Sequence, residues 1–118
     1  MLKEKTFSFA IEIVMVYKNL AEEKREFVLS KQLLRSGTSI GAMVREAQNA
    51  ESKMDFIHKL AIAQKECDET LYWLELLNAT GYLNDEKFTT CFQNATEIFR
   101  ILKSSILTVK QNLNKSKH

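Results

Sequence analysis

The stretch Gln32-Leu33-Leu34-Arg35-Ser36-Gly37-Thr38-Ser39-Ile40-Gly41-Ala42 decides the fold, because it places two of the chain's three glycines where the apolar spacing is helical. Glycine inside a helix costs about 1 kcal/mol relative to alanine. Gly37 and Gly41 are four residues apart, so they share one face of the helix. With Ser36, Ile40 and Val44 they form a face of small side chains, which predicts close packing against another helix backbone.

The composition predicts a single all-α domain. The 118 residues include no proline and three glycines, and 27% are charged. Such a balance is typical of one globular, helix-rich domain. No apolar run reaches the ~20 residues of a membrane span, and no cleavage site follows the apolar N-terminal segment. We therefore expect a cytoplasmic protein that has no membrane partner.

Apolar spacing divides the chain into four expected helices, at about 6–24, 28–50, 53–79 and 85–113, with a frayed tail over 114–118. In the last helix eight apolar residues follow one another at intervals of three and four, from Phe88 to Leu113. Two other helices have similar seams, and this period of 3.5 residues predicts left-handed packing.

Residues that typically begin or end helices lie at these boundaries. Ser52 followed by Asp55 predicts a capping box for the third helix, Thr80-Gly81 predicts its end, and Asn84 is expected to cap the fourth. The connections are then only a few residues long. Short connections make consecutive helices antiparallel, so we predict an up-and-down left-handed four-helix bundle.

The first helix is apolar nearly all round, since only Ser8 and Glu12 are polar between Phe7 and Tyr17. A helix in an isolated bundle needs one polar face. The pattern favours an interface between copies of the chain on its second side. A flattened bundle that buries this helix more deeply is the alternative.

The sequence contains no recognised catalytic or metal motif. Glu46, Glu66 and Glu69 could serve a di-iron site, but neither histidine has the Glu-x-x-His spacing that such sites use. Glu66 and Glu69 are instead interpreted as ion-pair partners of Arg35, Arg45 or Lys65, or as solvated.

The remaining motifs also fail. The glycine block lacks the Lys-Ser/Thr pair of a phosphate-binding loop. Cys67 and Cys91 fit no zinc motif and are expected to be small core residues of a reducing compartment. We expect no enzyme and no cofactor.

Basic residues give the remaining functional signal. Arg35, Arg45 and Lys53 are expected on a common side of the second helix and the turn after it. From Ile98 onward the chain has no acidic residue, and its basic residues are Arg100, Lys103, Lys110, Lys115 and Lys117. Either group could contact a phosphate backbone; solvated faces and internal salt bridges are the alternative.

Tyr72 and Trp73 are interpreted as packing residues. Nearby carboxylates would repel phosphates, which argues against base stacking. Packing between helices or subunits would let the hydroxyl and the indole N–H find polar partners.

The glycine block, Glu46-Ala47, Ser52-Lys53-x-Asp55-Phe56 and Tyr72-Trp73-Leu74-x-Leu76-Leu77 together resemble the bacterial 23S rRNA intervening-sequence proteins. The resemblance runs from about residue 7 to residue 107. It implies a homopentameric ring of four-helix bundles, with a ribosomal-protein label and no established catalytic residues. The chain is also similar to the accessory variability protein of diversity-generating retroelements, a basic barrel that binds nucleic acid and a reverse transcriptase.

Two functional hypotheses follow. The first is a non-enzymatic oligomer that binds RNA or DNA through basic surfaces repeated around a ring. The second is a protein-interaction scaffold that docks a partner such as a reverse transcriptase. In both, Ser36, Gly37, Ile40, Gly41, Tyr72 and Trp73 are architectural.

Overall fold

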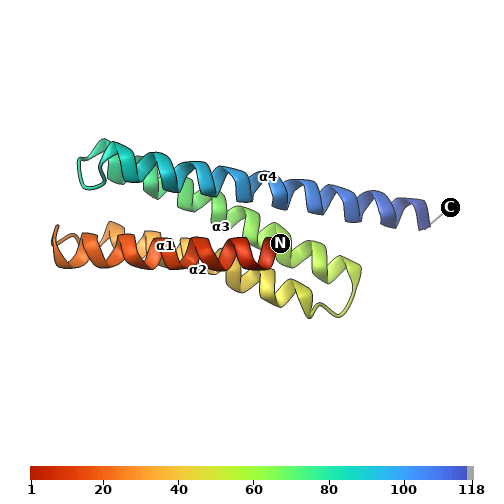
Figure 1. Cartoon of the computed structure of the whole chain (residues 1–118). Coiled ribbons are helices and arrows are strands. Elements are labelled where there is room, and N and C mark those ends of the chain that lie inside the picture. Colours follow the sequence, from red (N-terminus) through yellow and green to blue (C-terminus); the bar gives the residue numbers. More distant parts are fainter. Residues whose placement is uncertain (117–118) are drawn as a thin grey trace.

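The computed structural model describes residues 1–116 as four α-helices: α1 (Leu2–Glu22), α2 (Leu29–Gln48), α3 (Lys53–Ala79) and α4 (Asp85–Ser116). Each helix runs antiparallel to the one before it, in a bundle of 56 × 22 × 21 Å (Figure 1). The helices pack as neighbours in the order α1, α2, α3, α4, and α4 touches α1 more sparsely. The all-α four-helix bundle is therefore confirmed, with α1 and α3 at opposite corners.

Two helix ends differ from the sequence prediction by more than two residues. α1 begins at Leu2 rather than near residue 6, because the N-terminal amine pairs with Glu4 at 2.9 Å and negative charge stabilises a first helical turn. α4 continues to Ser116 instead of fraying from Asn114, since Val109 and Leu113 still pack against the core. Residues 117 and 118 of the predicted tail lie outside the described residues.

The core consists of one buried apolar row from each helix. Ile13, Leu33, Leu74 and Leu102 are fully buried members of the four rows. The apolar spacing placed Met43, Phe56, Phe92 and Phe99 on the predicted seams, but at these four points the buried residue is a direct neighbour in the sequence. Val44, Ile57, Cys91 and Ile98 are buried, whereas Met43, Phe56, Phe92 and Phe99 are only partly buried. The buried residues Cys91, Ala95, Ile98 and Leu102 of α4 still follow one another at intervals of four and three, so the spacing is as predicted and the buried face is displaced by one residue.

The glycines of α2 lie where α1 comes closest. A Cβ atom at Gly37 would lie 2.8 Å from Ile13 Cγ2, and one at Gly41 would lie 3.3 Å from the backbone oxygen of Thr6. Real Cβ atoms do not approach side chains as closely as 2.8 Å. The expected close helix contact is thus confirmed, and α1 is the helix that makes it.

Side-chain caps fix the second and third connections. Ser52 Oγ accepts the backbone N–H of Asp55 at 3.0 Å, and Asn84 Oδ1 accepts that of Lys87 at 2.8 Å. α3 ends at Ala79, and Gly81 follows with a φ of 83°, a conformation that glycine adopts readily. The predicted N-caps at Ser52 and Asn84 and the predicted end of α3 are confirmed. The capping box is only half formed, because the Asp55 carboxylate accepts the backbone N–H of Glu51 instead of that of Ser52.

The connection between α1 and α2 uses a cap that the sequence analysis did not predict. The Glu26 carboxylate accepts the backbone N–H groups of Val28, Leu29 and Ser30, the last at 2.7 Å. Partial burial alone would raise the pKa of Glu26, but these hydrogen bonds outweigh it and lower the pKa below its ordinary value of 4.5. A charged Glu26 therefore holds the start of α2.

We predict that Gly41→Leu disrupts folding or assembly. The added side chain would push against the Thr6 backbone, which cannot rotate away, and overpacking of this kind costs roughly 1–3 kcal/mol or more. Urea unfolding followed by circular dichroism measures the loss. Gln32→Leu, which adds an exposed leucine to the same helix, is the control. Unchanged stability of Gly41→Leu would show that the small face is not a packing surface.

We predict that Glu26→Gln lowers the free energy of unfolding by about 1 kcal/mol at pH 7, as loss of a helix cap does. Because the folded-state pKa of Glu26 is depressed, its contribution is present above pH 4.5 and is lost as the pH falls through the folded-state pKa. The difference between wild type and variant should shrink below pH 4.5. Glu22→Gln, a change at an exposed glutamate of α1, is the control. If the stability difference between wild type and Glu26→Gln did not depend on pH, a charged Glu26 would not be the cap of α2.

Candidate nucleic-acid interface

Arg35 joins α2 to α3 through two carboxylates. Its guanidinium lies 3.0 Å from Glu66 Oε2 and also donates to Glu69 Oε2. Desolvation would lower the pKa of Arg35, but the two carboxylates outweigh it and raise the pKa. Of the partners considered from the sequence, Arg35 is therefore the one that pairs with Glu66 and Glu69. Its charge is balanced within the subunit.

The same polar network includes Trp73 and a buried hydroxyl pair. Trp73 Nε1 donates to Glu69 Oε2 at 3.1 Å, and Thr70 Oγ1 donates to Ser36 Oγ at 3.0 Å. Tyr72 packs edge-on against Trp73, with ring centroids 5.0 Å apart, and is 55% exposed. The indole N–H of Trp73 thus has a polar partner, as expected if Tyr72 and Trp73 are packing residues.

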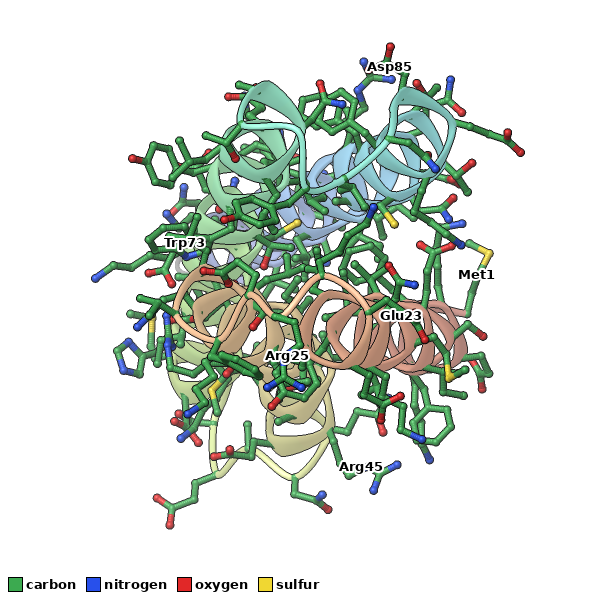
Figure 2. All side chains as sticks on the ribbon, turned by 90° about the vertical axis from the view of Figure 1, so that its left-hand side faces the viewer. Met1, Glu23, Arg25, Arg45, Trp73 and Asp85 are labelled. Atoms are coloured by element: carbon green, nitrogen blue, oxygen red, sulfur yellow. The ribbon has the colours of Figure 1, made fainter. Side chains whose placement is uncertain are left out.

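Arg45 lies toward α1, whereas Arg35 pairs with α3. Arg45 lines an open groove of about 780 Å³ between α1 and α2, together with Lys3 and Phe7. Figure 2 shows the Arg45 side chain directed away from the bundle. Lys53 is the first residue of α3, beyond the turn. The structure therefore directs Arg35 and Arg45 to different neighbouring helices, and the grouping of Lys53 with either of them stays a prediction.

The C-terminal half of α4 carries three exposed cations on one side. Arg100, Lys103 and Lys110 fall within about 80° of one another around the helix axis, and Leu107 lies among them with 56% exposure. The nearest preceding acid on this helix, Glu97, pairs with Lys5 of α1 at 2.9 Å. Glu97 therefore faces the α1 side. We call Arg100, Lys103 and Lys110 the α4 basic row.

Lys65 of α3 lies on a different surface from the α4 basic row. Cys67 Sγ contacts the backbone oxygen of Ala95 at 3.2 Å, so Cys67 faces α4. Lys65 precedes Cys67 by two residues, which is about 200° around the helix axis, and it therefore points away from α4. Its exposed side chain shares the face of Tyr72, which follows seven residues later.

Residues 1–116 contain two cysteines and other side chains of the types that bind metal ions. Burial, with Asp68 nearby, raises the pKa of the Cys67 thiol to about 12, and burial with Glu12 nearby does the same for Cys91. Both cysteines are buried, as predicted for core residues. Across residues 1–116, no three His, Cys, Asp or Glu side chains are grouped for a metal ion. No helix within that range is long and apolar enough to cross a bilayer.

The family model of the 23S rRNA-intervening sequence proteins matches residues 2–104, which is most of the chain. The chain belongs to this family. The match includes the α2 glycines, the Arg35 network and the first residues of the α4 basic row. Only Lys110 of that row lies beyond it, so this cation is outside the part described by the family model.

A solved member supports the same relationship. The protein from Bacteroides thetaiotaomicron VPI-5482, described as a protein of unknown function from the S23 ribosomal protein family, is 53% identical to this chain. The similarity covers 90% of this chain and 98% of that one, with a TM-score of 0.89. No protein with a curated description matches the chain.

We predict that Arg35→Gln lowers the free energy of unfolding by about 0.5–1 kcal/mol, the range for partly exposed ion pairs, and leaves nucleic-acid affinity unchanged. Urea unfolding at low and high salt measures the first effect, and a gel-shift titration measures the second. Salt should shrink the stability difference, because it screens the ion pair that the variant lacks. A large loss of affinity with unchanged stability would assign Arg35 to the ligand instead.

Proposed function

We propose that the protein is a non-enzymatic, self-associating helical bundle that binds structured RNA through the α4 basic row. The observation that carries the proposal is the row itself: three exposed cations share one side of a helix segment with no carboxylate from residue 98 to residue 116. Cations of this kind supply most of the sequence-independent affinity for phosphate backbones. The family's name refers to 23S rRNA, which makes rRNA the first ligand to test.

Self-association would strengthen this surface. One chain has a net charge of only +2. Phe7, Ile11 and Met15 form an outward stripe on α1 in which each side chain is 51–58% exposed. Exposed apolar residues that recur every fourth position on one helix mark a protein contact. An oligomer built through this α1 stripe repeats the basic row, and the repeated rows produce a stronger summed field.

A protein-docking scaffold is the second candidate. Tyr72 is exposed beside Asp68 and Glu75, and an aromatic residue flanked by acids suits a protein partner better than a phosphate backbone. A partner such as a reverse transcriptase would then occupy these surfaces, and nucleic-acid contact would be incidental. The test of RNA binding separates the two candidates.

We predict that the double variant Lys103→Glu/Lys110→Glu binds an rRNA stem-loop at least about tenfold more weakly at low salt, because two attractive interactions with phosphates become repulsive. A gel-shift titration at several salt concentrations measures the change. The slope of log K against log salt should become shallower, by about 0.9 for each duplex phosphate that the variant no longer neutralises.

Lys87→Glu is the single-charge control, since Lys87 is also exposed on α4 but lies at the opposite end of the helix. Lys87→Glu should weaken binding much less than Lys103→Glu alone. Absence of binding by the wild type to rRNA fragments and duplex DNA, or binding that salt does not affect, would remove the proposal and favour the scaffold. Equal losses in the control would show a non-specific charge effect.

A further inference from the structure

Two exposed surfaces with apolar centres lie at opposite corners of the bundle. One is the α1 stripe of Phe7, Ile11 and Met15. The other, the α3 patch, consists of exposed Asp68, Tyr72 and Glu75 and partly buried Leu76. α1 and α3 do not pack together, and Figure 2 shows Trp73 of α3 on the side of the bundle away from Met1 of α1. The two surfaces therefore face in different directions.

The two surfaces also lie at the same height along the bundle. Ile13 packs against Gly37 of α2, and the adjacent Ser36 bonds to Thr70 of α3. Ile13 and Thr70 are thus level. Because α1 and α3 run in the same direction (Figure 1), Met15 is level with Tyr72. If a neighbouring copy is related by rotation about an axis parallel to the bundle, residues at equal heights meet. The α1 stripe of one copy can then contact the α3 patch of the next.

The charges at this height are complementary. Lys18 follows Ile13 by five residues, and Glu75 follows Thr70 by five, so these opposite charges are also level. Both side chains are exposed. Within the described part of the chain, neither has an ion-pair partner. Contact between the α1 stripe and the α3 patch of two copies would pair them at the edge of an apolar centre.

We infer that the α1 stripe of one copy docks on the α3 patch of a second copy, with Tyr72 against Ile11 and Met15 and with Glu75 against Lys18. The inference rests on the self-association in the proposed function and specifies its geometry. Pairing of α1 with α1 about a two-fold axis would leave every α3 patch uncovered, and an axis along the bundle would also place Lys18 near its own copy. Pairing of two different surfaces covers both and closes into a ring when the rotation permits.

Complementation between two single-surface variants tests this geometry. Ile11→Glu blocks the α1 stripe and Tyr72→Glu blocks the α3 patch; both positions are more than half exposed, so the bundle should still fold. Light scattering after gel filtration should show an oligomeric wild type and monomeric single variants. An equimolar mixture at about 0.1 mM should form a dimer and nothing larger, because it retains one intact interface without the avidity of a ring.

Three results would overturn the inference: a monomeric wild type, a Tyr72→Glu variant with the mass of the wild type, or a mixture that stays monomeric. Leu107→Glu, exposed on α4 outside both surfaces, is the control and should keep the wild-type mass. Circular dichroism verifies that each variant is folded.

Charge exchange provides a second test that does not introduce charge into an apolar surface. Lys18→Glu and Glu75→Lys should each weaken association about tenfold, and the double variant should restore it. A double variant as weak as the two single changes combined would contradict the pairing. These masses are measured without RNA, so failure of the pairing is distinguishable from failure of RNA binding. An oligomeric wild type with unaffected variants would retain self-association and reject only this geometry.

Discussion

The close contact of α1 with α2 at Gly37 and Gly41 is the constraint on which the rest of the structure depends. Ile13 fills the space beside Gly37, and the backbone of Thr6 passes Gly41. Larger residues at either glycine would move α1 outward or rotate it. Because the contact fixes which side of α1 faces inward, the outward side must carry Ile11 and its neighbours. An apolar surface is therefore a consequence of how the core is closed.

The polar contacts between α2 and α3 divide the basic residues into two groups. Arg35 is balanced by Glu66 and Glu69, and Lys59 pairs with Glu46 at 3.2 Å. These cations hold helices together. On the C-terminal half of α4 no acid is available for such pairing, so its cations remain directed to solvent. The chain thus separates cations that are paired between helices from cations that are exposed on α4.

The two proposals use different surfaces of the same rigid bundle. Self-association would bury the apolar residues of α1 and the aromatic patch of α3, while the α4 basic row stays on the outside of each copy. This arrangement would raise the nucleic-acid affinity of a subunit with low net charge, since affinity depends on the number of cations that contact one nucleic acid. Assembly and binding are then separable by mutation, although the second is strengthened by the first.

The sequence by itself determined the four helices, their caps at Ser52 and Asn84, and the small face that requires a close neighbour, because these features depend on local spacing and on backbone geometry. Only the tertiary structure decided that α1 is that neighbour, that Arg35 is paired within the subunit, and that Cys67 of α3 meets Ala95 of α4. Such facts depend on the register between helices. Many residues separate the partners along the chain, and side-chain packing alone selects which of them meet.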